Sequence, residues 1–179
     1  YMYNPKHWRN YLPRTYYITH SLGPVMCATG ATPKIVTAFA SFAPHEDDVP
    51  SAEFVGDRAA IITTHNDDGS VFRVTGWEQF GAEDNTYRIC GTKGQIENIR
   101  GEDDQIMLRF NSCDQPEGMK HVNKYTPEWN IEDKDLAEKA GHGGGDFFTV
   151  KVFLDCIKEN KQPMFDVYFA TTLSAVAIL

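Results

Sequence analysis

An imidazole and a phenol lie three residues apart in the stretch Tyr17-Ile18-Thr19-His20-Ser21-Leu22-Gly23-Pro24. Imidazole titrates near neutral pH, and a phenol can donate to a substrate hydroxyl or relay a proton. Tyr17 and His20 are therefore the best candidates in this chain for moving protons on a substrate. The alternative is that His20 only caps a helix or fills a core, as a lone histidine more often does.

A second group of polar residues and glycines lies nearer the other end, in Gly141-His142-Gly143-Gly144-Gly145-Asp146. Glycine lets a ligand or another stretch of backbone approach closely, so His142 is a candidate substrate contact. The same glycines could equally form a hinge in front of a helix. Together with Tyr17 and His20, the cluster suggests a substrate pocket.

The sequence predicts neither a metal site nor a dinucleotide site within this chain. The four cysteines are widely spaced, and the other histidines have no partners at metal-ligand spacing. The Gly91-Thr92-Lys93-Gly94 segment lacks the spacing of a phosphate-binding loop, and no glycine fingerprint for NAD occurs. Any redox cofactor must therefore be held by something else.

The charge and composition exclude several classes of partner. A formal net charge of −8 argues against nucleic acid and against anionic membrane surfaces, which select basic faces. No apolar stretch is long enough to span a bilayer. Four irregularly spaced cysteines favour a reducing compartment such as the cytoplasm, although two disulfides are left open.

Short strands separated by tight turns, followed by helices, predict an α+β fold. We expect an open-faced, mostly antiparallel sheet with helices packed on one face. Strands are expected over 34–42, 58–64, 71–80, 86–90, 95–99 and 104–110, with a hairpin turn at 66–70.

Three helices are expected, each beginning at a polar cap. Ser21 caps the first, which ends at Gly30 and places His20 at a helix amino end, where the dipole favours a neutral imidazole. Asp146 caps the second, and its apolar residues recur at helical spacing up to Asn160. Asp166 caps the third, which is apolar nearly all round and is therefore expected to be buried.

Residues 1–179 are expected to form one domain cut from a longer protein, because the last helical pattern has no stop signal. The first fourteen residues are aromatic and basic. Arg9, Arg14 and the neighbouring tryptophan suit an anionic or polyhydroxylated ligand, or else the aromatic residues cover the edge of a core.

The 17–24 and 91–94 stretches, together with Ala140-Gly141-His142-Gly143-Gly144-Gly145-Asp146-Phe147-Phe148, resemble the C-terminal domain of the Gfo/Idh/MocA family. The resemblance is closest to its NAD-dependent glycosidase branch, glycoside hydrolase family 109, whose type activity is on α-N-acetylgalactosaminides. It implies a parent in which an N-terminal Rossmann domain, absent from this chain, holds NAD or NADP. It also implies a carbohydrate substrate such as an N-acetylhexosaminide, and a homo-oligomer.

The resemblance also implies roles for individual residues. Tyr17 and His20 would be catalytic, while Tyr1, Thr19 and His142, with Arg9 or Arg14, would contact the sugar. The parent would be a glycosidase that works by transient oxidation at C3 and elimination. The alternatives are a sugar dehydrogenase with net redox turnover and a non-catalytic oligomerisation module. Many dehydrogenases of the family have an aspartate four residues before the histidine, and Tyr16 at that position disfavours an inositol- or glucose-dehydrogenase type of site. The isolated chain is expected to be inactive.

Overall fold

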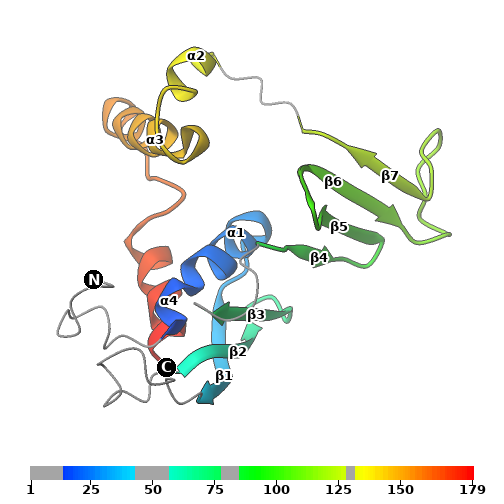
Figure 1. Ribbon diagram of the computed structural model, residues 1–179, viewed down its shortest axis with the longest axis horizontal. Helices are drawn as coiled ribbons and strands as arrows, with labels where there is room; N and C mark the ends of the chain where they lie inside the picture. Colours follow the sequence, from blue (N-terminus) through cyan, green and yellow to red (C-terminus); the bar gives the residue numbers. More distant parts are fainter. Residues whose placement is uncertain (1–13, 43–56, 78–84, 128–131) are drawn as a thin grey trace, which may run out of the picture. The chain divides into compact units, whose positions relative to one another are not determined.

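The computed structural model describes residues 14–42, 57–77, 85–127 and 132–179 (Figure 1). These residues form two compact units. One unit combines the chain up to Ile89 with Val167–Leu179, and the other comprises Cys90–Asp166. In the sequence, the second unit is therefore inserted between two stretches of the first unit.

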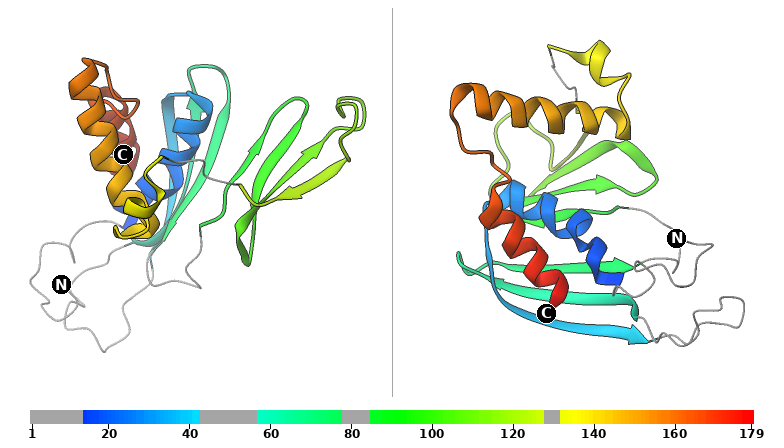
Figure 2. Two further views of the ribbon diagram at one scale, coloured as in Figure 1. Left: turned by 90° about the horizontal axis from the view of Figure 1, so that it is seen from above. Right: turned by 90° about the vertical axis from the view of Figure 1, so that its left-hand side faces the viewer.

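A three-stranded antiparallel sheet with two helices on one face makes up the first unit (Figure 2). Its strand order is β1-β2-β3. The elements are the 3-10 helix η2 (Arg14–Ile18), α1 (Thr19–Thr29), β1 (Pro33–Phe42), β2 (Asp57–Asn66), β3 (Val71–Trp77) and α4 (Val167–Ile178). Helix α1 packs on β3 and on α4, and α4 packs on β1.

The core of this unit follows from the alternation of side chains along its strands. Ile62 of β2 and Val74 of β3 are register partners, and both are buried. They face Leu22 of α1 and Leu173 of α4 in one hydrophobic cluster. Successive side chains of a strand point to opposite faces, so Ile61, the neighbour of Ile62, is exposed on the other side of the sheet.

The hairpin turn predicted at 66–70 is confirmed. The amide of Asn66 donates to the carbonyl of Ser70 at 2.9 Å, and Gly69 has a φ of 83°, which glycine adopts without strain. The buried Thr64 hydroxyl donates to the Asn66 side chain at 2.7 Å, and that side chain donates to the Ser70 hydroxyl at 2.9 Å. Polar groups at the end of the core thus satisfy one another.

The second unit contains a four-stranded sheet and a helical segment. The sheet order is β4-β5-β6-β7, with β4 (Arg88–Cys90) crossing the boundary between the units, β5 (Gly94–Ile99), β6 (Glu102–Phe110) and β7 (Val122–Tyr125). The helical segment consists of α2 (Lys134–Ala137), the 3-10 helix η3 (His142–Gly144) and α3 (Gly145–Glu159). Helix α3 packs on α2 and η3.

The predicted α+β class is confirmed, with the described strands divided between two sheets. The prediction that Ser21 caps the first helix is wrong, because a 3-10 turn leads directly into α1 at Thr19. The Ser21 hydroxyl instead donates to the carbonyl of Thr75 at 3.2 Å. Gly30, with a φ of 74°, ends this helix as predicted.

Two predictions about the later helices are also wrong. Helix α3 begins at Gly145 rather than after an Asp146 cap, because Gly143 and Gly144 take left-handed backbone angles that end the preceding turn. Helix α4 follows Asp166 but buries only Leu173 and Val176. A helix that is apolar all round covers just the stripe that faces its neighbours, and Val167, Tyr168 and Ile178 of α4 stay exposed.

All four cysteines are free, so the disulfides that the sequence left open do not form in this structure. No helix among residues 14–42, 57–77, 85–127 and 132–179 has the length and apolar character needed to cross a membrane.

Two glycines in the turn between β4 and β5 differ in what they tolerate. A Cβ on Gly94 would clash with the backbone carbonyl of Arg109 on the paired strand, whereas a Cβ on Gly91 would meet only an ordinary contact at 3.8 Å. We predict that Gly94→Ala destabilises the β5–β6 pair by about 1–3 kcal/mol, as overpacking does. Hydrogen exchange of the β5 and β6 amides measures this effect, with Gly91→Ala as the control. Equal protection in both variants would contradict the packing argument.

Candidate functional site

Tyr17 and His20 lie side by side where η2 passes into α1. Their ring centroids are 5.4 Å apart and the rings meet edge to face at 66°. Tyr16 stacks beside Tyr17 with a centroid separation of 4.3 Å. Because Tyr17 is half-buried and His20 is exposed, the phenol is held by its surroundings while the imidazole faces solvent. A helical spacing of three residues thus brings a proton donor and a base to one surface.

The imidazole of His20 has one of its two nitrogens engaged by the preceding residue. Its Nδ1 lies 3.2 Å from the hydroxyl oxygen of Thr19. If Nδ1 carries the proton and donates to that hydroxyl, the lone pair at Nε2 faces solvent as a base. The other tautomer would accept the hydroxyl proton at Nδ1 and present an N–H at Nε2. Thr19 therefore influences which proton transfer His20 can perform.

The backbone of His20 is also held in an unusual way. Pro24 lies within α1, four residues after His20, and proline has no amide proton to donate to the carbonyl at that position. The carbonyl of His20 instead accepts a hydrogen bond of 2.5 Å from the phenol of Tyr87. A gap in the helical hydrogen bonding is thus filled by a side chain from the segment before β4.

Partial burial raises the pKa of the Tyr87 phenol above its ordinary value of 10.0. Burial disfavours the charged phenolate, so the phenol stays protonated and able to donate through the neutral and mildly alkaline range. The hydrogen bond from Tyr87 to the His20 carbonyl is therefore present throughout that range.

Further contacts fix the segment that carries Tyr17 and His20. The Thr15 hydroxyl donates to the carbonyl of Ala177 in α4 at 3.1 Å, and the Ser21 hydroxyl donates to β3. Ile18 and Leu22, on either side of His20 in the sequence, are both fully buried. The segment that carries the two candidate catalytic residues is thus held by buried neighbours and hydrogen bonds and is not a free loop.

The second candidate, His142, lies in the other unit and is paired with an acid. Its Nδ1 is 2.9 Å from a carboxylate oxygen of Asp146, one turn later. His142 has a φ of 54°, in the left-handed region that is uncommon for residues other than glycine. Gly144 is equally constrained, because a Cβ there would lie 3.3 Å from Ala137. The glycines therefore shape a tight turn that holds an oriented imidazole.

The structure brings three of the predicted site residues together in the first unit. Tyr17, Thr19 and His20 form one cluster, and Arg14 is the first residue of η2. His142 belongs to the second unit. Tyr1 and Arg9 lie outside the described residues.

Sequence reasoning missed two participants. Tyr87 received no role, although a proline inside a helix indicates that the carbonyl four residues earlier needs another donor. The sequence predicts Asp146 as a helix cap, but its carboxylate instead contacts the His142 imidazole. The Tyr87 contact depends on how the chain folds back, whereas the four-residue spacing of His142 and Asp146 is a local signal that could have indicated their pairing.

The described residues do not suit a metal or a dinucleotide. No group of three His, Cys, Asp or Glu side chains gathers among them. The strand pairs β1–β2, β2–β3, β5–β6 and β6–β7 are all antiparallel, whereas dinucleotides bind at the carboxyl edge of a parallel sheet. A nicotinamide cofactor would therefore have to be held elsewhere.

The fold is similar to part of several oxidoreductases of known structure. A UDP-N-acetylglucosamine 3-dehydrogenase from Acidithiobacillus ferrooxidans is similar over 90% of this chain and 45% of its own, at 17% identity and a TM-score of 0.59. An oxidoreductase from Agrobacterium radiobacter, solved with NAD+, L-tartaric acid and magnesium, is similar over 90% and 44%, at 12% identity and a TM-score of 0.63.

The chain belongs to the family of the glycosyl hydrolase 109 C-terminal domain, whose family model matches residues 61–179. A glycosyl hydrolase family 109 protein from Stenotrophomonas maltophilia is 28% identical over 97 residues, which cover 52% of this chain and 20% of that protein. The chain thus spans less than half of the relatives it resembles. The resemblance to the C-terminal domain of a Gfo/Idh/MocA-type protein is confirmed.

The hydrogen bond from Tyr87 to His20 leads to a prediction about stability. Tyr87→Phe removes only the hydroxyl, and we expect it to lower the free energy of unfolding by about 0.5–1.5 kcal/mol at neutral pH. Urea denaturation measures this loss. Tyr125→Phe, an exposed tyrosine on β7, is the matched control and is expected to have little effect.

The same bond predicts a dependence on alkaline pH. Because the folded pKa of Tyr87 is raised, its contribution is fully present below the unfolded pKa of about 10 and is lost as pH rises above that value. The wild-type protein should therefore lose stability above pH 10 more steeply than Tyr87→Phe. Parallel curves for the two proteins would show that the phenol does not act in this way.

Proposed function

We propose that this chain is the sugar-binding catalytic domain of an NAD- or NADP-dependent glycosidase, which cleaves its substrate by transient oxidation at C3 and elimination. The observation that carries the proposal is the Tyr17–His20 pair, fixed with ring centroids 5.4 Å apart in a chain of the glycosyl hydrolase 109 family. A half-buried phenol beside an exposed imidazole suits proton transfer on a sugar carbon and its leaving oxygen.

The residues of this chain would divide the proton transfers between them. His20, with Nδ1 directed by Thr19, acts as the base that removes the proton at C2, and Tyr17 donates to the departing glycosidic oxygen. The opposite assignment, with Tyr17 as base, uses the same geometry. Either way the two rings must both reach the sugar, and their common surface at the start of α1 allows this.

The cofactor would be held by a Rossmann domain that adjoins this chain in the parent protein. When bound, a nicotinamide ring supplies reversible hydride removal from a sugar hydroxyl carbon. NAD-dependent glycosidases are known exceptions to the paired-carboxylate route of glycoside hydrolysis. Without that domain, we expect the isolated chain to be inactive.

Other predicted residues would bind the substrate. Tyr1, Arg9 and Arg14 are proposed to contact sugar hydroxyl groups, as the family resemblance implies. His142, oriented by Asp146, is proposed as a further contact through its Nε2. An N-acetylhexosaminide is the substrate class we propose.

A sugar dehydrogenase is the second candidate. The same residues would then deprotonate a substrate hydroxyl, and an oxidised sugar would leave together with a reduced cofactor. Similar folds in a UDP-N-acetylglucosamine 3-dehydrogenase and a levoglucosan dehydrogenase support it at the level of fold alone. Stoichiometric formation of NADH from a free sugar would favour this candidate over the glycosidase.

The catalytic assignment predicts a separation between turnover and cofactor affinity. In the full-length protein, His20→Ala should lower kcat by a factor on the order of 10²–10⁴, as expected for loss of a general base. The Kd for NAD should stay within about twofold, because this chain does not hold the cofactor. Steady-state kinetics and NAD titration measure the two quantities. Equal activity in the variant and the wild type would exclude His20 as the base.

We also propose that the open face of the β1–β2–β3 sheet joins two copies of the protein. Phe39 and Ile61 are register partners on that face, and they are 80% and 53% exposed. Ile35 and Val71 add exposed apolar side chains further along the same face, beyond the row of Thr37, Thr63 and Arg73. An apolar sheet face of this kind commonly marks an interface, and a two-fold dimer would cover it with an identical face.

Replacing one of these side chains by a charge tests the interface. Phe39→Asp should raise the dimer dissociation constant at least about tenfold, because a fully buried aromatic residue contributes 1.5–3 kcal/mol. Sedimentation equilibrium measures this change. Phe153→Asp, at an exposed position on α3, is the matched control. A wild-type protein that remains monomeric across micromolar concentrations would contradict the proposal.

A further inference from the structure

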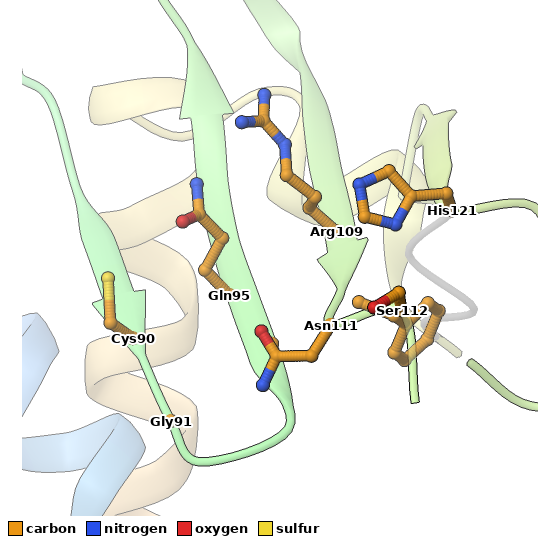
Figure 3. Close-up of a pocket in the computed structure, with 9 residues that line it drawn as sticks. Cys90, Gly91, Gln95, Arg109, Asn111, Ser112 and His121 are labelled. Atoms are coloured by element: carbon orange, nitrogen blue, oxygen red, sulfur yellow. The ribbon is translucent and has the colours of Figure 1, made fainter. Parts of the chain in front are cut away.

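The second unit contains a pocket that none of the proposed catalytic residues enters. It has a volume of about 490 Å³ and lies between the β4–β5 turn and the loop that joins β6 to β7. Volumes of 300–1,000 Å³ are usual for sites that bind small molecules. Figure 3 shows the side chains of Gln95, Arg109, Asn111, Ser112 and His121 around it.

Backbone hydrogen bonds hold the rim of this pocket in place. The amide of Gly91 donates to the carbonyl of Gly94 at 2.8 Å and closes the turn on one side. Asn111 joins that turn to the other side, because its amide donates to the Lys93 carbonyl at 2.9 Å and its side chain to the Thr92 carbonyl at 2.7 Å. The Phe110 amide donates to the His121 carbonyl at 3.0 Å. These bonds fix the turn and the loop on the two sides of the pocket.

The side chains that line the pocket are neutral or basic. Of the nine described residues that line the pocket, none is acidic, in a chain that carries 25 Asp and Glu against 17 Lys and Arg. The lining instead offers the guanidinium of Arg109, the imidazole of His121 and the hydroxyl of Ser112. A site that keeps cationic and neutral donors while excluding carboxylates is suited to an anion.

Contacts within the protein engage few of the hydrogen-bond donors of Arg109, Ser112 and His121. In the part of the chain that the structure describes, Arg109 forms no ion pair and has only a 3.7 Å contact to the sulfur of Met107, and the Ser112 and His121 side chains make no hydrogen bond. Two carboxylates near the lining are occupied by amide donors. Glu97 accepts from Gln95 at 2.7 Å, and Asp114 lies 3.5 Å from the Asn111 side-chain nitrogen. The guanidinium is thus left for a ligand.

We infer that this pocket binds the oxyanion group of a small molecule, with Arg109 as the principal contact and Ser112 and His121 as further donors. A planar guanidinium matches the oxygen pairs of phosphate and carboxylate, which are the two sources of such a group. The site lies entirely within Cys90–Asp166, whereas Tyr17 and His20 belong to the other unit. The inference therefore goes beyond the proposed glycosidase activity and does not depend on it.

The test is isothermal titration calorimetry of the full-length protein with inorganic phosphate and, separately, with acetate. Excess NAD is present so that a dinucleotide site elsewhere is filled. Loss of a charge-assisted contact predicts that Arg109→Gln weakens binding about tenfold or more. Arg100→Gln removes the same charge from the turn between β5 and β6, outside the pocket lining, and is expected to stay within about twofold of the wild type.

The variants and the two probes give decisive outcomes. Ser112→Ala, which removes only a hydroxyl from an exposed loop, should weaken binding by a smaller factor and decides the matter if Arg109→Gln fails to fold. Tighter binding of phosphate would identify a phosphorylated ligand, and tighter binding of acetate a carboxylate; both support the site. Absence of saturable binding by either probe, or equal weakening by Arg109→Gln and Arg100→Gln, would overturn it.

Discussion

The hydrogen bond from the Tyr87 phenol to the His20 carbonyl is the contact on which the candidate site depends. Pro24 cannot donate to that carbonyl, so α1 has a missing hydrogen bond one turn after its start. Without another protein donor this exposed carbonyl would be left to solvent, and the turn to which it belongs carries His20. A phenol with a raised pKa supplies the missing donor at 2.5 Å. The position of the imidazole thus depends on a residue 67 positions further along the chain.

The packing beneath this turn explains why it can be held so firmly. Ile18 and Leu22 anchor it in the core that α1, α4 and the inner face of the sheet share. Thr15 and Ser21 tie the same segment to α4 and β3 by donating to backbone carbonyls. Apolar burial provides the affinity of the helix for the sheet, and the polar contacts fix its orientation. The exposed side of the turn is then free for a substrate.

Much of this arrangement could be predicted from the residues, and the failures have physical causes. Alternating apolar residues gave the strands around the Asn66–Ser70 turn, because a strand exposes every second side chain. The start of α1 was misplaced because Ser21 is a good cap in principle, while the actual sequence enters the helix through a 3-10 turn. Tyr87 could not be identified, since nothing local marks a tyrosine that reaches a distant carbonyl. The burial of α4 was overestimated because composition does not specify how many neighbours a helix has.

The central claim is that Tyr17 and His20 move protons on a sugar that is transiently oxidised. The most direct measurement uses the full-length protein with an aryl N-acetylhexosaminide in heavy water, following release of the aryl group and deuterium at C2 of the freed sugar. Oxidation and elimination require the C2 proton to leave, so the account predicts aryl release with deuterium at C2. Aryl release with the original hydrogen retained at C2 would contradict it, because the bond would then have been cleaved without proton removal at that carbon.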